Sequence, residues 1–137
     1  MLNKLIDKLN NHFLKNNNLS NFDINNCIFD SLEYKIKLKK NDYNKTILFK
    51  NDIFEIIIIF WDEGSIAPKH NHPKNGCLLT VIEGELEETI FNKNIIKKNI
   101  LTKNTHSYIH DKYGLHKIYS KNKSVSLHIY SPPNFYD

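Results

Sequence analysis

The sequence predicts a single all-β domain, an antiparallel sandwich or barrel, with a short helical segment in front of it. The chain has 137 residues, a length that favours one domain with a core of its own. From about residue 33, short β-rich segments follow one another at near-even spacing, with no helical pattern between them. Before that point, apolar side chains recur at helical spacing. We therefore expect an N-terminal helical segment, residues 1–32, packed on a barrel domain, residues 33–137.

Residues 2–14 show the apolar stripe of an amphipathic helix. The stripe consists of Leu2, Leu5, Ile6, Leu9, Phe13 and Leu14. The three asparagines at 16–18 end this pattern. Residues 19–32 are ambiguous, and a second short helix after Ser20 or Asn21 is one interpretation.

Strands are predicted where β-branched and aromatic residues gather between short polar turns. Tyr34–Leu38 alternates between apolar and polar residues, as a half-buried strand does. The other predicted strands are Thr46–Phe49, Phe54–Trp61, Cys77–Ile82, Leu86–Phe91, Ile95–Lys97, Tyr108–Ile109, Lys117–Tyr119 and Ser124–Tyr130.

The composition argues against a nucleic-acid or membrane protein. The formal charge is +4, but the lysines are scattered among Asn and acidic residues, and no nucleic-acid-binding motif is found. No apolar run approaches the roughly 20 residues that span a bilayer. Lys4, Asp7 and Lys8 interrupt the N-terminus, so we expect no signal peptide and a cytoplasmic location. In a reducing compartment the two cysteines, Cys27 and Cys77, need no disulfide.

The spacing of the histidines is the most informative feature of the sequence. His70 and His72 project from the same side of an extended segment, because side chains in a strand repeat every two residues. A barrel can bring the distant His116 to the same place. Three neutral imidazoles suit iron, zinc, copper or nickel and leave coordination positions open. A His-x-His pair alone also occurs on ordinary exposed loops.

The residues around these histidines resemble the cupin motifs. Gly64, then His70-x-His72, then Cys77 and Gly84 reproduce the spacing of the first cupin motif, in which a Glu usually stands at the position of Cys77. Gly114-Leu115-His116 supplies the histidine of the second motif. The string Ser126-Leu127-His128-Ile129-Tyr130-Ser131-Pro132-Pro133 closely resembles the cysteine dioxygenase family. The resemblance runs from about Tyr43 to Pro133 and implies a cupin fold, an antiparallel jelly-roll β-barrel.

The resemblance implies a non-haem Fe(II) centre held by His70, His72 and His116. It also implies oxidation of a thiol by O2 to a sulfinic acid. L-cysteine is the first substrate to expect, and the product is then cysteine sulfinic acid. We expect a monomer, because members of this family are often monomeric.

The resemblance also assigns roles to residues near the metal. Cys77 and Tyr130 match a pair that can join through a thioether bond, and the alternative for Cys77 is a buried free thiol. Ser126 and His128 match residues that orient Tyr130, and the three side chains alternate along one strand, so they face the same way. Trp61 matches an aromatic of the pocket wall, with plain core packing as the alternative.

One departure from the family concerns the substrate carboxylate. Cysteine-specific members hold it with an arginine, and this chain contains no arginine. Lys45 aligns with that position, and Tyr43 is a second predicted contact. Lysine keeps the charge but loses the bidentate fork of arginine. The alternative is that Lys45 faces solvent and that the substrate differs.

Other functions stay open at this stage. Within the same chemistry, the substrate could be 3-mercaptopropionate or cysteamine. A non-catalytic metal-binding cupin or a redox sensor is a different class. A zinc or nickel cupin isomerase is the third alternative, although such cupins usually keep the carboxylate ligand that is missing here.

Overall fold

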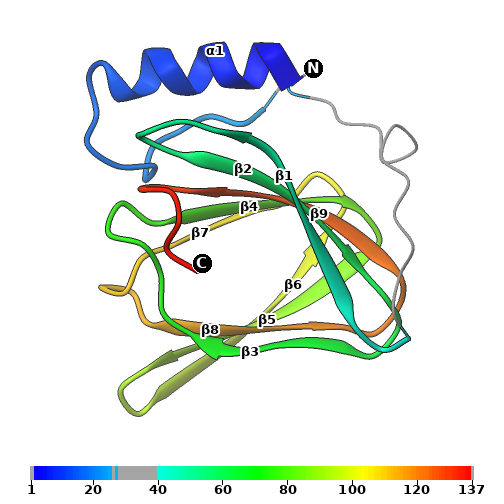
Figure 1. The fold of residues 1–137 in the computed structure, drawn as a ribbon. Coiled ribbons are helices and arrows are strands. Elements are labelled where there is room, and N and C mark those ends of the chain that lie inside the picture. Colours follow the sequence, from blue (N-terminus) through cyan, green and yellow to red (C-terminus); the bar gives the residue numbers. More distant parts are fainter. Residues whose placement is uncertain (1, 26, 28–39, 137) are drawn as a thin grey trace.

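Two antiparallel sheets and one helix make up the part of the chain that the computed structural model describes, residues 2–25, 27 and 40–136 (Figure 1). The five-stranded sheet has the order β1-β2-β9-β4-β7, and the four-stranded sheet has the order β3-β8-β5-β6. The strands are β1 (Tyr43–Lys50), β2 (Glu55–Trp61), β3 (Ser65–His70), β4 (Cys77–Glu83), β5 (Glu85–Asn92), β6 (Ile95–Thr102), β7 (His106–Ile109), β8 (Leu115–Ser120) and β9 (Ser124–Tyr130). The predicted antiparallel all-β architecture is confirmed.

The predicted N-terminal helix is confirmed as α1 (Leu2–Phe13). Residues 14–25 contain no second helix, so the interpretation of a helix starting after Ser20 or Asn21 finds no support in the described residues up to 25. The strand predicted at Tyr34–Leu38 and the proposed boundary at residue 33 lie outside the described residues. The helix α1 lacks the length and apolar character needed to cross a membrane, and it is the only helix in the described residues.

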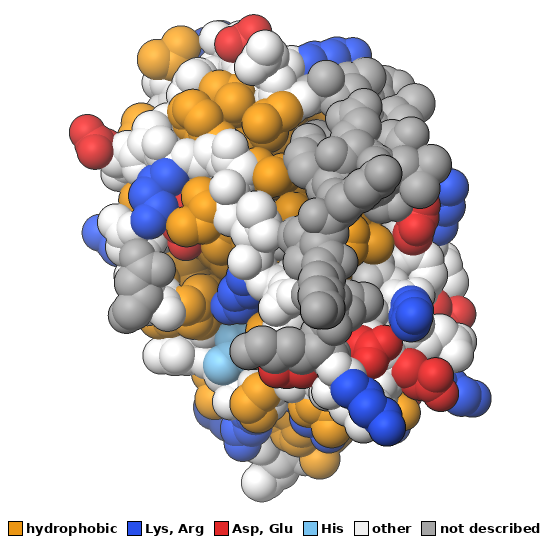
Figure 2. Space-filling view, turned by 45° about the vertical axis from the view of Figure 1, so that its right-hand side comes forward, with side chains coloured by type: hydrophobic (Ala, Val, Ile, Leu, Met, Phe, Trp, Pro, Cys, Tyr) orange, Lys and Arg blue, Asp and Glu red, His pale blue; other side chains and the backbone are white. Residues whose placement is uncertain are grey.

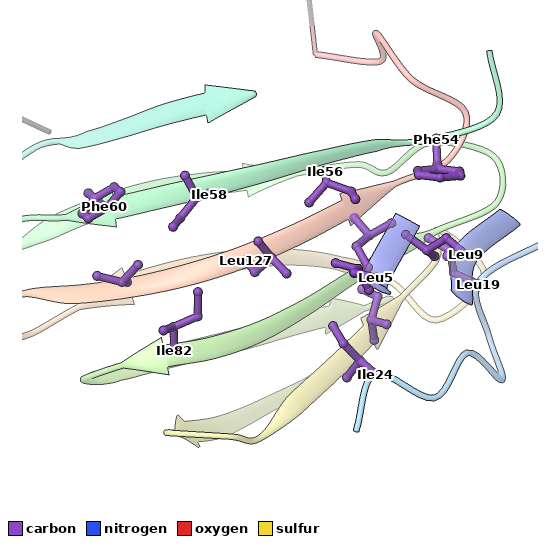
Figure 3. Packing of buried hydrophobic residues seen from close by; sticks show 13 residues of the cluster. Leu5, Leu9, Leu19, Ile24, Phe54, Ile56, Ile58, Phe60, Ile82 and Leu127 are labelled. Atoms are coloured by element: carbon purple, nitrogen blue, oxygen red, sulfur yellow. The ribbon is translucent and has the colours of Figure 1, made fainter. Parts of the chain in front are cut away.

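The central strands of the five-stranded sheet, β2, β9 and β4, are buried on both faces. On the outer face of the sheet, Leu5 and Leu9 of α1 belong to one apolar cluster with Ile56, Ile58 and Leu127 (Figure 3). On its inner face, a second cluster fills the space between the two sheets. This double burial explains why β2 is a continuous apolar run without polar alternation, because each of its faces needs apolar side chains.

The same double burial determines the direction of the side chains of β9. Val125, Leu127 and Ile129 belong to the outer cluster that α1 covers. The alternating residues therefore face the four-stranded sheet. These are Ser126, His128 and Tyr130, all buried. One strand thus carries an apolar face to the helix and a polar row to the interior of the sandwich.

The strand β3 was not predicted from the sequence. It pairs with β8, from Ser65 opposite Ser120 to His70 opposite His116, with an irregularity between Ala67 and His70. Pro68 lies in this irregularity and lies at the edge of its sheet, where a missing N–H is tolerated. The pairing places the first and third predicted metal ligands side by side.

Candidate metal centre

Three histidines converge at the irregular end of the β3–β8 pair. His70 ends β3, His72 follows it by two residues, and His116 lies on β8 directly opposite His70. One ring nitrogen from each lies within 4.8 Å of the other two. The ring centroids of His72 and His116 are 4.4 Å apart, and those of His70 and His116 are 4.5 Å apart. The structure therefore brings together the three residues that the sequence analysis proposed as ligands.

Each of these imidazoles has a hydrogen-bond acceptor at its Nδ1 atom. His70 Nδ1 lies 2.7 Å from the carbonyl oxygen of Pro68, and His72 Nδ1 lies 3.2 Å from Asp111 Oδ1. His116 Nδ1 lies 2.9 Å from Glu88 Oε2. Because carbonyls and carboxylates only accept hydrogen bonds, we assign the Nδ1–H tautomer to all three rings. Each Nε2 atom then carries a lone pair.

The Nε2 atoms have the environment of metal ligands. His70 Nε2 and His116 Nε2 face each other at 2.9 Å, and His72 Nε2 is buried without a hydrogen-bond partner. Burial, followed by the neighbouring His116, lowers the pKa of His70 to about 4 and that of His72 to about 2, so both are neutral at pH 7. In the assigned tautomers the three Nε2 lone pairs converge, which is unfavourable unless a cation lies there. A metal ion therefore fits this donor set.

Two carboxylates accept hydrogen bonds from the Nδ1 atoms of His72 and His116, on the side of each ring away from Nε2. Glu88 is fully buried, and it accepts hydrogen bonds from His116 Nδ1 and, at 2.7 Å, from Ser107 Oγ. Burial alone would raise the pKa of Glu88, but the hydrogen bonds from His116 and Ser107 outweigh it and hold the pKa below its ordinary value. Asp111 accepts from the backbone N–H of His72 at 2.8 Å in addition to its ring. Such partners fix the orientation of imidazole ligands.

Neither carboxylate was predicted from the sequence. A signal for Glu88 was present, because Glu88 alternates with Leu86 on β5 and therefore shares its buried, inward side. A lone carboxylate at such a position needs a partner. For Asp111, which lies in a loop, no periodic pattern gave a comparable signal.

A hydrogen-bonded chain runs along the inner row of β9. Trp61 Nε1 donates to Ser126 Oγ at 2.8 Å, and Ser126 Oγ lies 2.7 Å from His128 Nε2. His128 Nδ1 lies 3.2 Å from Tyr130 Oη. Burial lowers the pKa of His128 and raises the pKa of Tyr130 well beyond their ordinary values, so both are neutral. We assign Ser126 as donor to Nε2 and Nδ1–H as donor to Tyr130, which leaves the Tyr130 hydroxyl hydrogen for another partner.

Cys77 and Tyr130 lie directly opposite each other on β4 and β9. Paired residues on neighbouring antiparallel strands have Cβ atoms about 4.5–5.5 Å apart, within reach for side-chain contact. Both residues are buried, and Cys77 is a free cysteine. Burial raises the pKa of the Cys77 thiol well above its ordinary value, so this cysteine is not a thiolate in the absence of further partners.

A cavity of about 160 Å³ adjoins the histidines. It is smaller than the roughly 300–1,000 Å³ of pockets for drug-sized ligands, so it suits a small molecule. Seven of the predicted site residues are among its lining residues, whereas His72, Cys77 and Ser126 are not. The lining consists of Tyr43, Lys45, Ile59, Trp61, Ala67, Pro68, His70, His116, Ile118, His128, Tyr130 and Tyr136.

The residues predicted for the substrate come from the edge of the five-stranded sheet. Tyr43 and Lys45 share one face of β1, and Trp61 pairs with Tyr43 across β1 and β2. Lys45 is exposed, yet it lines the cavity. On the face shown in Figure 2, histidine surface lies beside a lysine and hydrophobic side chains, and the remaining lysines are scattered among acidic and uncharged side chains.

Comparisons with solved structures show the fold. KdgF from Halomonas sp. superposes with a TM-score of 0.63 at 15% identity, covering 79% of this chain and 94% of that one. A cupin superfamily protein from Desulfitobacterium hafniense superposes with a TM-score of 0.61 at 18% identity, covering 70% and 83%. The sandwich is therefore a cupin jelly roll.

Comparisons of sequence show the family. The human cysteine dioxygenase type 1 is 32% identical over 118 residues, covering 76% of this chain and 59% of that protein. The bovine cysteine dioxygenase type 1 is 37% identical over 94 residues, covering 61% and 47%. The chain thus spans about half the length of these relatives. The family model for cysteine dioxygenase type I matches residues 24–136. The chain belongs to the cysteine dioxygenase type I family.

Proposed function

We propose that this protein is a non-haem Fe(II) thiol dioxygenase that oxidises L-cysteine with O2 to cysteine sulfinic acid. The observation that carries the proposal is the convergence of three Nε2 lone pairs beside a small cavity that also contains Lys45 and Tyr130. Membership of the cysteine dioxygenase type I family supports the same chemistry. In the overall reaction, the thiol gains both atoms of one O2 molecule at sulfur, so no further reductant is consumed.

The proposed iron ligands are His70, His72 and His116. An imidazole ligand carries no negative charge, so these residues would not reduce the charge of a bound divalent ion. Ferrous iron held by these residues would supply open positions for the thiolate and for O2, and it would lower the pKa of the thiol. The buried Glu88 carboxylate keeps the His116 ring in the orientation that a ligand needs.

The proposed substrate contacts explain why a small amino acid thiol fits. Lys45 offers an ammonium group for the substrate carboxylate, and Tyr43 lies on the same face of β1. This ion pair is less directional than the bidentate pair that an arginine forms, because an ammonium group is a point charge. A substrate without a carboxylate, such as cysteamine, would lose this contact, whereas 3-mercaptopropionate would keep it.

Tyr130 is the proposed hydrogen-bond donor to the bound substrate or oxygen. Ser126 and His128 hold its phenol oxygen through the chain of hydrogen bonds on β9, and the phenol stays protonated at neutral pH. We also propose a thioether between Cys77 and Tyr130. It would join the cysteine sulfur to a ring carbon of the tyrosine, with the loss of two hydrogens to O2 as the oxidant.

Oxygen consumption tests the proposed function. Protein loaded with Fe(II) is mixed with L-cysteine, 3-mercaptopropionate or cysteamine in an oxygen electrode, and the product is identified by mass spectrometry. We expect O2 uptake matched by cysteine sulfinic acid, with L-cysteine as the preferred thiol. Uptake with another thiol alone would change the substrate but keep the chemistry. No uptake with any of the three would overturn the proposal.

A further inference from the structure

Tyr136 lines the cavity, although no sequence pattern indicated a role for it. It belongs to the segment that follows β9 and turns from the five-stranded sheet toward the other sheet (Figure 1). Its hydroxyl donates a hydrogen bond of 2.7 Å to the carbonyl oxygen of Asn71, the residue that separates His70 from His72 in the sequence. Burial raises the pKa of Tyr136 far above its ordinary value, so the phenol remains a donor at neutral pH.

Hydrogen bonds hold the segment that carries Tyr136 at several points. Ser131 is fully buried, and its hydroxyl donates to the carbonyl oxygen of Ile53 at 2.8 Å. Its own carbonyl accepts from the N–H of Asn75 at 2.8 Å. Further along, Lys50 donates a hydrogen bond to the side chain of Asn134. With the bond to Asn71, the segment is held at both ends, so the position of the Tyr136 ring is defined.

The Tyr136 ring contacts three parts of the candidate site at once. Its centroid lies 5.7 Å from that of His70, edge to face, and 5.0 Å from that of Tyr130. Lys45 Nζ lies 4.9 Å from the same centroid, within the range of a cation–π interaction. The ring is therefore adjacent both to the proposed carboxylate anchor and to two residues of the proposed reaction centre.

We propose that Tyr136 is a specificity-determining residue which fixes the ammonium group of Lys45 at the cavity and so makes the site selective for small thiols that carry a carboxylate. This inference rests on the proposed thiol dioxygenase function. It assigns to Tyr136 a positioning role toward the substrate, and no step of the oxidation.

Lysine has a flexible side chain. A lysine side chain loses considerable rotamer freedom when it is held in one place, and its ammonium group has no fixed direction of its own. A ring beneath the ammonium group restricts it before the substrate arrives, so less freedom is lost on binding. The ring also occupies volume next to Tyr130, which helps to keep the cavity near 160 Å³. Tyr136 would thus fix the position of the Lys45 ammonium group, whereas the planar guanidinium group of an arginine is directional by itself.

The test compares Tyr136→Ala and Tyr136→Phe with the unaltered protein. Binding of L-cysteine and of cysteamine to the Fe(II)-loaded protein is measured by calorimetry without O2, and KM and kcat are then measured with O2. For Tyr136→Ala we expect the Kd and KM for L-cysteine to rise about five-fold, which is the size of one partly exposed cation–π contact. The values for cysteamine, which lacks the carboxylate, and the kcat for L-cysteine should change little. Tyr136→Phe keeps the ring and should retain most of the selectivity.

Tyr113→Ala is the matched control. Tyr113 is a half-exposed tyrosine whose ring also has a lysine over it, with Lys112 Nζ at 5.8 Å, but it does not line the cavity. This variant should leave the binding of both thiols unchanged. Thermal melting of each variant shows whether it is folded.

Two outcomes would overturn the inference while the proposed function stands. One is unchanged L-cysteine binding in Tyr136→Ala, and the other is an equal loss for L-cysteine and cysteamine, which would make the ring a plain wall of the cavity. If the unaltered protein binds neither thiol, the proposed function itself fails, and the inference falls with it.

Discussion

At the scale of single residues, the tautomers of three histidines follow from the hydrogen-bond acceptors next to their Nδ1 atoms. Pro68, Glu88 and Asp111 each offer an oxygen to one Nδ1 atom, and the Nε2 atoms are left to converge. The convergence of the three candidate ligands was predictable, because His70, His72 and His116 stand in motifs of fixed spacing. The residues that bind the Nδ1 atoms were harder to predict, because their contacts depend on strand register and loop geometry, which the spacing of the histidines does not determine.

Glu88→Gln should weaken metal binding while the protein stays folded. The amide of glutamine is a weaker acceptor than a carboxylate for the Nδ1–H of His116, so the ligand is less well oriented and less basic. We expect Fe(II) affinity to fall about 10- to 100-fold, measured by competition with a chelator. The matched control is Glu87→Gln, since Glu87 pairs with Lys98 at the surface at 3.0 Å. Equal affinity of both variants and the unaltered protein would contradict the assigned role.

Lys45→Ala should raise the KM for L-cysteine about 3- to 10-fold, the size of a partly exposed ion pair. The kcat should change much less, because the proposed partner of Lys45 is the substrate carboxylate and not the reacting sulfur. Steady-state KM and kcat are measured with Lys98→Ala as the control. Lys98, on β6, pairs with Glu87 and does not line the cavity. If KM for L-cysteine is the same in all three proteins, Lys45 is not the carboxylate anchor.

At the scale of elements, most strands were predictable from alternation and β-rich composition, and β9 was predicted with its observed bounds. The strand β3 was missed because Pro68 interrupts it and no β-branched run marks it. β1 is longer than predicted, Tyr43–Lys50 in place of Thr46–Phe49, and the extra residues bring Tyr43 and Lys45 into the strand beside the cavity. Tyr136 was missed because it lies in a segment without periodic structure, placed by hydrogen bonds to distant parts of the chain.

The register of β4 and β9 predicts the outcome of one covalent test. Cys77 lies opposite Tyr130, so the proposed thioether needs no rearrangement of the backbone. After turnover with Fe(II), L-cysteine and O2, the intact mass of the protein should decrease by two hydrogens. Tryptic peptides containing Cys77 and Tyr130 should appear joined. Cys77→Ser should show neither change, and Cys27→Ser, at the other free cysteine, should show both. Separate peptides in the unaltered protein after extended turnover would refute the cross-link.

At the scale of the whole molecule, the helix and the site occupy opposite faces of one sheet. The outer cluster under α1 stabilises the five-stranded sheet, and the inner face of that sheet carries the polar row of β9. The sequence already contained both halves of this arrangement, as the amphipathic stripe of residues 2–14 and the alternation in residues 124–130. The exact meeting of β3, β8 and the segment after β9 at one cavity depends on the tertiary fold.

The buried His128 should make the stability of the metal-free protein depend on pH. Burial holds its pKa in the folded protein well below the ordinary value of 6.5, so the unfolded chain binds the proton more readily. This contribution to stability is therefore complete above about pH 6.5 and decreases as the pH falls below it, by about 1.4 kcal/mol per pH unit. Urea unfolding of the unaltered protein and of His128→Gln between about pH 7.5 and 5.5 measures the difference in slope. Parallel curves would mean that His128 titrates normally in the folded protein.

The central claim is that both atoms of O2 reach the sulfur of a thiol bound beside His70, His72 and His116. Turnover of L-cysteine by the Fe(II)-loaded protein under isotopically labelled O2, followed by mass spectrometry of the product, tests it most directly. The proposed function predicts cysteine sulfinic acid with two labelled oxygens, and no such product from His116→Ala. A product with one labelled oxygen or none, or labelled sulfinic acid at an undiminished rate from His116→Ala, would contradict it.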